Sequence, residues 1–107
     1  MFARLVTMKL KANSAEEFSR LIDNEILPLL RKQNGFRDEI TFISRGRALG
    51  ISLWDTQEDA VAYKGTGYPE VLKTLSKVLK GKPTVETFEV ANSTLHKLTA
   101  KAASKTA

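Results

Sequence analysis

The chain has 107 residues, a length that predicts one domain able to bury a core without covalent cross-links. It contains no cysteine, which excludes disulfides, thiolate metal sites and a cysteine nucleophile and fits a reducing cytoplasm. No apolar run approaches the roughly 20 residues that span a bilayer, and no secretory signal pattern follows Met1, so we expect no membrane partner.

The net charge of +5 is unevenly distributed along the chain. Residues 93–107 carry three lysines and no acid, which leaves +2 for the rest. Residues 1–92 show no basic patch with interleaved aromatic side chains, so we expect no nucleic-acid partner. We predict a domain over residues 1–92 and a basic C-terminal tail over residues 93–107 that is a short helix or disordered.

The first third of the chain predicts a strand followed by a helix. Residues 2–10 have apolar side chains at both odd and even positions, as in a strand in which neither face is fully exposed to solvent. Ser14 followed by Glu17 predicts a capping box at the start of a helix. Pro28 removes one backbone donor and should kink this helix, and Gly35 supplies a left-handed stop.

The remainder predicts a hairpin, a second helix and a last strand. Residues 36–44 and 48–54 are strand-like and are joined by a short turn around Arg45 and Gly46. An acidic helix start follows at residues 55–59. The glycines and proline of residues 65–69 predict an interruption, interpreted as a hinge or lid, before the helix resumes over residues 70–79. Residues 85–90 alternate like a strand.

This order of elements, βαββαβ, predicts an α+β ferredoxin-like fold, in which two helices cover one face of a four-stranded antiparallel sheet. Strand alternation prevents all of the apolar strand residues from facing the helices. The open face should therefore carry apolar groups mixed with Arg4, Glu39 or Thr41. The residues that cannot all face the helices are Leu5, Thr7, Ile51, Leu53 and Phe88. An exposed apolar sheet face favours an interface, and we expect a homodimer that pairs sheet to sheet.

Three motifs allow a more specific prediction of the fold family. They are the segment 53–60 around Trp54 with its helix cap and acidic run, Asn34-Gly35-Phe36 after the first helix, and the terminal strand 84–90. In their order and spacing the chain resembles the antibiotic biosynthesis monooxygenase superfamily of dimeric α+β barrels over approximately residues 2–90. The resemblance implies a pocket between sheet and helices that is open to small hydrophobic or aromatic ligands.

Some members of that superfamily oxidise phenolic polyketides or quinols with dioxygen and no cofactor, whereas others degrade haem. The haem-degrading branch uses an asparagine, a tryptophan and a histidine. By the resemblance, their positions in this chain fall at or next to Val6, at Tyr63 and near Lys73, and none of the three residues is kept. Its one histidine, His96, lies in the tail, where we expect it to be solvated. We therefore expect neither haem nor another cofactor.

The candidate catalytic residues are Tyr63 and Tyr68, which flank the glycine-rich segment and are able to stack on an aromatic ligand, and Lys64, which is a base if desolvated. Each has a plainer alternative, namely packing for the tyrosines and a solvated ammonium for the lysine. The candidate pocket residues are Leu5, Thr7 and Trp54, although Trp54 equally fits a core anchor.

Arg4 on the first strand has two interpretations, since it either steers an anionic ligand or pairs with Glu39 or Glu89 across an interface. We expect no metal site, because no cluster of His, Asp and Glu has ligand spacing. No serine has a histidine partner within the domain.

Two function classes remain open from the sequence. One is a cofactor-independent monooxygenase acting on a small aromatic or hydrophobic substrate of the phenol or quinol type. The other is a non-catalytic homodimeric module that binds a hydrophobic metabolite or a partner protein. Fold alone does not choose between them.

Overall fold

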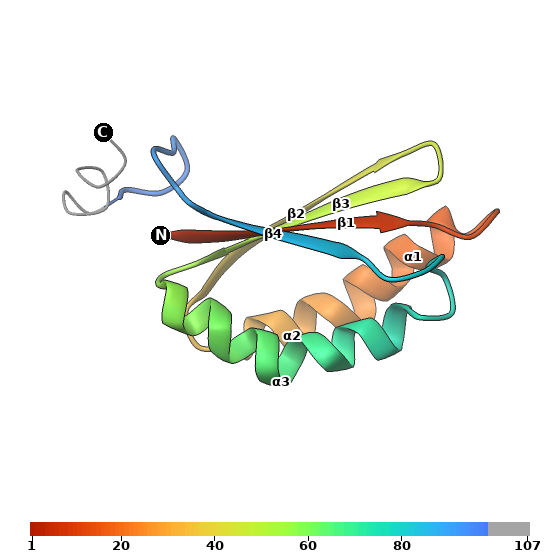
Figure 1. Cartoon of the computed structure of the whole chain (residues 1–107), viewed down its shortest axis with the longest axis horizontal. Helices are drawn as coiled ribbons and strands as arrows, with labels where there is room; N and C mark the ends of the chain where they lie inside the picture. Colours follow the sequence, from red (N-terminus) through yellow and green to blue (C-terminus); the bar gives the residue numbers. More distant parts are fainter. Residues whose placement is uncertain (99–107) are drawn as a thin grey trace.

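The computed structural model describes residues 1–98, which form a four-stranded antiparallel sheet with helices on one face (Figure 1). The strands lie in the order β2-β3-β1-β4, so the predicted ferredoxin-like α+β fold is confirmed. The elements in chain order are β1 (Phe2–Lys9), α1 (Ala15–Leu21), a π-helical segment (Ile22–Ile26), α2 (Leu27–Arg31), β2 (Phe36–Ser44), β3 (Arg47–Trp54), α3 (Gln57–Leu75) and β4 (Thr84–Glu89).

The first helical region differs from the expectation at its start and its centre. Ser14 is the N-cap residue of α1, but its side chain makes no capping hydrogen bond, so the predicted capping box is absent. The irregularity expected from Pro28 takes the form of a π-helical segment, in which the Leu27 amide donates to the carbonyl of Ile22. The helical turn thus contains one extra residue immediately before Pro28, which has no N–H to donate.

The helix α3 runs without a break from Gln57 to Leu75, so the predicted interruption and hinge at residues 65–69 are wrong. It begins at a real cap, in which the Thr56 hydroxyl oxygen accepts from the Asp59 amide at 3.1 Å. Its buried residues continue at spacings of three and four straight through the glycines: Ala60, Tyr63, Gly67, Val71 and Leu75. Burial of this stripe outweighs the poor helix propensity of glycine and proline.

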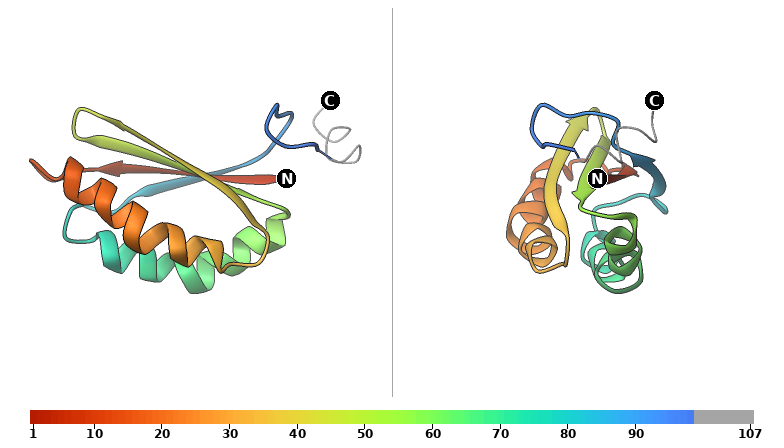
Figure 2. Two further views of the ribbon diagram at one scale, coloured as in Figure 1. Left: turned by 180° about the vertical axis from the view of Figure 1, so that it is seen from behind. Right: turned by 90° about the vertical axis from the view of Figure 1, so that its left-hand side faces the viewer.

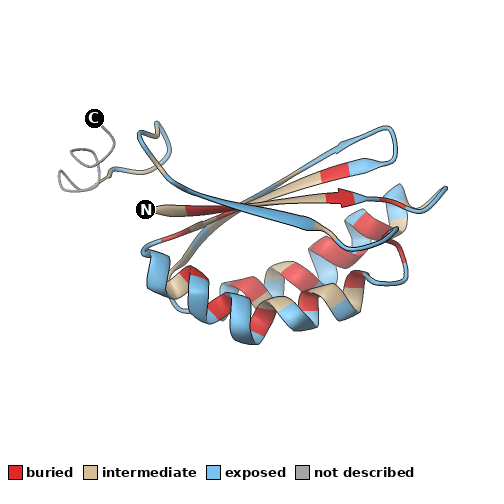
Figure 3. Cartoon of the chain, in the orientation of Figure 1, coloured by how far each residue is buried: buried red, intermediate tan, exposed pale blue. Residues whose placement is uncertain are grey.

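The core lies between the helices and the sheet, as the two opposite views in Figures 1 and 2 show. Trp54 and Phe18 are its largest fully buried side chains. Buried residues line the helix surfaces that face the sheet, whereas β4 is exposed along its whole length (Figure 3). The helices therefore cover β1, β2 and β3 much better than they cover β4.

The register separates the two faces of the sheet. Leu5 pairs with Ile51 and Ile51 with Ile40, so these three side chains share one face, which is the face without helices. Leu49, Leu53, Phe42 and Phe88 lie on the same face by the same register. This open face carries many apolar groups, as predicted, mixed with polar residues that include Thr7, Asp38 and Glu86. The prediction that Arg4, Glu39 and Thr41 also lie there is wrong, because alternation places all three toward the helices.

The described part of the tail, residues 93–98, contains no helix. Just before the tail, the Val90 amide donates to the carbonyl of Met1 at 3.0 Å, and within the tail the His96 ring contacts the Asp38 carboxylate on β2. His96 is therefore half-buried and not solvated as expected. Residues 99–107 lie outside the described part of the chain, so the prediction for them is untested. Within residues 1–98 no helix is long and apolar enough to cross a membrane.

Gly67 and Gly65 provide a matched pair that tests why α3 is continuous. A Cβ on Gly67 would lie 2.8 Å from Cδ1 of Tyr63, whereas a Cβ on Gly65 would meet nothing within 4 Å. We expect Gly67→Ala to lower the free energy of unfolding by about 1–3 kcal/mol through overpacking. Gly65→Ala should raise it by about 0.5–1 kcal/mol, because alanine is the better helix former.

Urea unfolding followed by circular dichroism measures both effects. An equal response of the two variants would contradict the close packing of Gly67 against Tyr63.

Candidate functional site

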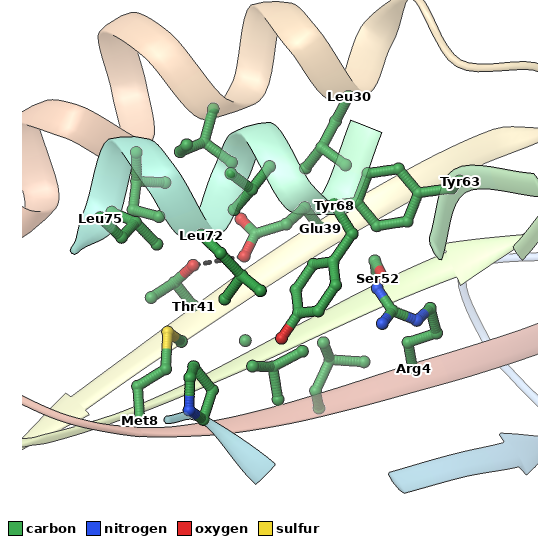
Figure 4. A pocket seen from close by; sticks show the side chains of 17 residues that line it. Arg4, Met8, Leu30, Glu39, Thr41, Ser52, Tyr63, Tyr68, Leu72 and Leu75 are labelled. Atoms are coloured by element: carbon green, nitrogen blue, oxygen red, sulfur yellow. Dashed lines mark hydrogen bonds between the residues drawn. The ribbon is translucent and has the colours of Figure 1, made fainter. Parts of the chain in front are cut away.

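A pocket lies between the helix-facing side of the sheet and the helices α2 and α3 (Figure 4). Its walls are mainly apolar, from Val6 and Met8 on β1, Leu30 on α2, and Leu72 and Leu75 on α3. The polar lining groups come from three neighbouring strands and from α3: Arg4, Glu39, Thr41, Ser52, Tyr63 and Tyr68. The free cavity measures about 50 Å³. An apolar chamber with a few convergent polar groups is the usual form of a small-molecule site.

Arg4 is the most unusual residue of the pocket, because it is charged and only 2 % exposed. Its guanidinium carbon lies 4.3 Å from the ring centroid of Tyr68 and 5.1 Å from that of Tyr63, so the cation faces two aromatic rings. Among residues 1–98, no carboxylate lies within 4.0 Å of it in an ion pair. The positive charge is thus stabilised by aromatic faces and is left without a counter-ion.

The two tyrosines form an aromatic wall that continues into the core. The ring of Tyr63 stacks on Trp54 with centroids 4.7 Å apart, and the Tyr68 ring lies 6.0 Å from Tyr63. Burial raises the pKa of Tyr63 to about 12 against the opposing charge of Arg4, and burial also raises the pKa of Tyr68. Both hydroxyls are therefore neutral at physiological pH, so they are able to donate hydrogen bonds to a ligand and do not serve as bases.

Glu39 on β2 supplies the carboxylate of the pocket. Burial raises its pKa, against a hydrogen bond that the Thr41 hydroxyl donates to one carboxylate oxygen. A carboxyl group with a raised pKa in an apolar chamber is suited to accept and release a proton. Asp23, across the pocket wall, adds to the rise through its negative charge.

The structure brings together some of the predicted site residues and separates others. Tyr63 and Tyr68 both line the pocket. Lys64 lies on the exposed side of α3, because one helical step from Tyr63 turns its side chain away. Leu5 and Thr7 occupy the opposite parity of β1 and lie on the open face, so the expectation that they line this pocket is not met.

Trp54 is fully buried and does not line the cavity; it supports Tyr63 from behind and donates its indole N–H to the Ser52 hydroxyl at 2.9 Å. Sequence reasoning assigned no pocket role to Glu39, Thr41 or Ser52. The signal that could have found them is register, because Arg4 pairs with Ser52 and Ser52 with Glu39, which places all three in one row across three strands. Within residues 1–98, no group of three or more His, Cys, Asp or Glu side chains is arranged to hold a metal ion.

Comparisons with known proteins connect this architecture to solved structures. Neither a protein-family model nor a curated protein matches the chain. A protein of unknown function from Nitrosomonas europaea superposes with a TM-score of 0.74 at 16% identity over 92% of this chain and 94% of its own. A monooxygenase from the gene ActVA-Orf6 of Streptomyces coelicolor, solved with the ligand nanaomycin D, gives 0.73 at 16% identity over 90% and 92%.

A protein from Deinococcus radiodurans, provisionally assigned as an antibiotic biosynthesis monooxygenase, gives 0.71 at 15% identity over 87% of this chain and 95% of its own. The chain therefore has the fold of the antibiotic biosynthesis monooxygenases, and the resemblance seen in its sequence motifs is confirmed at the level of fold.

The pKa of Glu39 predicts a pH-dependent effect on stability. Because burial raises this pKa, folding favours the neutral carboxyl, and the contribution of Glu39 is present at acid pH and lost as the pH rises through the raised value. We expect Glu39→Gln, which stays neutral and keeps an acceptor for Thr41, to be more stable than the wild type at pH 7. The gain should vanish below about pH 4, the ordinary range of a glutamate.

Urea unfolding at both pH values provides the measurement, with the exposed Glu70→Gln on α3 as the control. A gain of equal size at pH 4 and pH 7 would show that charge burial at Glu39 is not the cause.

Proposed function

We propose that this protein is a cofactor-independent monooxygenase that oxidises a small aromatic substrate of the phenol, quinol or anthrone type. The observation that carries the proposal is the buried Arg4 guanidinium, which has no carboxylate partner among residues 1–98 and shares an apolar pocket with the carboxyl group of Glu39. Oxidation by dioxygen alone requires a substrate anion, and this pair supplies both a proton acceptor and a positive charge.

The chemistry divides among the residues as follows. Glu39 takes a proton from the substrate, and its raised pKa fits it for that step. Arg4 stabilises negative charge that develops in the chamber, where the low dielectric strengthens its effect. The neutral hydroxyls of Tyr63 and Tyr68 donate hydrogen bonds, and the apolar walls exclude water from reactive intermediates. For an anthrone the balance is one substrate and one dioxygen to one anthraquinone and one water.

The fold neighbours favour small-molecule binding by this chain, but they do not identify its reaction or its substrate. The Streptomyces coelicolor monooxygenase carries a bound ligand within the same fold, which favours small-molecule binding here as well. At 16% identity that likeness concerns the fold, so the substrate class rests on Arg4, Glu39 and the aromatic wall of this chain.

Replacement of the proposed base tests the reaction. We expect oxygen uptake with anthrone in the wild type, and Glu39→Gln should lower kcat by about 10²- to 10⁴-fold because proton removal is lost. Glu70→Gln, exposed on the same domain, should leave kcat unchanged within twofold. Loss of activity in Lys64→Ala instead of Glu39→Gln would identify the lysine as the base. No uptake with any phenol, quinol or anthrone would support the non-catalytic module.

We also propose that the active form is a homodimer in which the open sheet face is covered by a second copy. Phe42 on the edge strand β2 is 50 % exposed on this face, and Phe88 on the opposite edge strand β4 is 49 % exposed on it. Exposed apolar groups gathered on one sheet face are typical of an interface. Localisation in the cytoplasm fits the lack of cysteine and remains part of this proposal.

Two neighbouring residues on β2 test the dimer. Phe42→Glu places a charge on the open face, whereas Ile43→Glu places the same charge on the other face at a similar exposure, 42 % against 50 %. We expect Phe42→Glu to raise the dimer dissociation constant at least 100-fold in sedimentation equilibrium. Ile43→Glu should leave the dimer intact, and equal weakening by both variants would contradict this choice of interface.

A further inference from the structure

The volume of the pocket conflicts with its use by an aromatic ring. The free cavity of about 50 Å³ exceeds the roughly 10–15 Å³ that one water needs, yet it is far below the roughly 150 Å³ of a cavity that binds benzene. As the side chains stand, the chamber beside Arg4 and Glu39 accepts diatomic molecules or waters, and a phenol does not fit in it.

A second cavity adjoins the chamber on its outer side. This outer groove lies between the C-terminal end of α3 and β4, and its volume is about 520 Å³, which is within the range of drug-sized ligand sites. Its walls are mainly apolar, with Ser76 and Lys82 as polar groups beside Tyr68, Leu72, Leu79, Gly81, Pro83 and Val85. It exists because the helices leave β4 uncovered. Tyr68, Leu72 and Pro83 also line the inner chamber, so the two spaces share a wall.

We propose that the site is divided, with the aromatic ring of the substrate in the outer groove and dioxygen in the inner chamber beside Arg4. This inference rests on the proposed function and assigns a place to each of its two reactants. The occupant of the groove is a flat molecule of two or three fused rings, because the groove holds about 520 Å³, is mainly apolar and is bordered by the Tyr68 ring. Its reacting edge meets the shared wall.

The division gives Arg4 a specific role. The ring anion passes one electron to dioxygen, which becomes superoxide, and the ring becomes a radical. Superoxide then lies next to a guanidinium that has no carboxylate partner within residues 1–98, so its charge is stabilised where it forms. The radicals combine in a carbon–oxygen bond, and the protonated peroxide releases water to leave the ketone. Glu39 takes the first proton from the ring through one water in the chamber and returns it by the same route to the peroxide anion; the second ring proton leaves with the oxygen–oxygen bond cleavage that forms water.

Two substitutions address the two spaces separately. Ser76→Phe fills the outer groove from an exposed position, and Lys77→Phe adds the same ring on the next residue, which does not line the groove. Gly50→Ala places one methyl group in the inner chamber, because its Cβ would lie 3.5 Å from Cε of Met8 and 3.7 Å from Oε2 of Glu39, at ordinary contact distances. Gly50→Ala therefore narrows the chamber without a clash.

The experiment combines anaerobic binding with gas binding. Anthrone is titrated under nitrogen against the fluorescence of the single tryptophan, Trp54, which stacks on the pocket residue Tyr63. Xenon, a probe for small apolar cavities, is followed by NMR of residues around the chamber. We expect Ser76→Phe to raise the anthrone Kd at least tenfold and to leave xenon binding unchanged, with Lys77→Phe like the wild type. Gly50→Ala should abolish the xenon shifts, keep the anthrone Kd within twofold and raise the KM for dioxygen severalfold.

Several results would overturn the division of the site. These are a failure of anthrone to bind the wild type, an equal loss of anthrone affinity in Gly50→Ala and Ser76→Phe, and no xenon binding in the chamber. Turnover with dioxygen that persists while Gly50→Ala weakens anthrone binding would reject the division but keep the monooxygenase. Anthrone binding in the groove with no oxygen uptake would reject the monooxygenase and, with it, the role given to dioxygen.

Discussion

Burial of one guanidinium is the constraint on which the pocket depends. Transfer of a charge from water to a protein interior costs several kcal/mol unless other groups compensate for it. Arg4 is 2 % exposed, and the compensation visible around it comes from the faces of Tyr63 and Tyr68, with which a desolvated cation interacts by about 2 kcal/mol or more. A counter-ion would neutralise the site and remove its attraction for an anion. The aromatic partners stabilise the cation and leave that attraction in place.

The same constraint explains why α3 has its unusual sequence. Tyr63 and Tyr68 both lie over Arg4 on a helix that stays regular between them. Gly67 permits the Tyr63 ring to take this position, because a larger residue would meet that ring and the side chain of Gln33. Pro69 then costs one backbone hydrogen bond, and the Thr66 hydroxyl donates to the carbonyl of Ala62 one turn earlier. The glycine-rich segment therefore serves packing in the aromatic wall, not the opening of a lid.

Much of the fold was predictable because its signals are local. The turn at Arg45 and Gly46 has positive φ at both residues, as a tight hairpin requires, and Gly35 adopts the left-handed conformation expected of a helix stop. The site was less predictable, because β1 is apolar on both parities and its sequence does not reveal which face meets the helices. Arg4 and its row were predicted on the open face, and tertiary packing places them toward the helices instead.

The alternation of side chains along β1 assigns one face of the sheet to the pocket and the other to the proposed dimer contact. Arg4, Val6 and Met8 point to the pocket, while Leu5 and Thr7 point to the face that we propose for dimer contact. A shift of one residue in the pairing of β1 would exchange the two sets, expose the guanidinium on the interface and bury Leu5 and Thr7 under the helices. Register is thus fixed from both sides, by the aromatic faces that receive Arg4 and by the apolar surface that a second copy would cover.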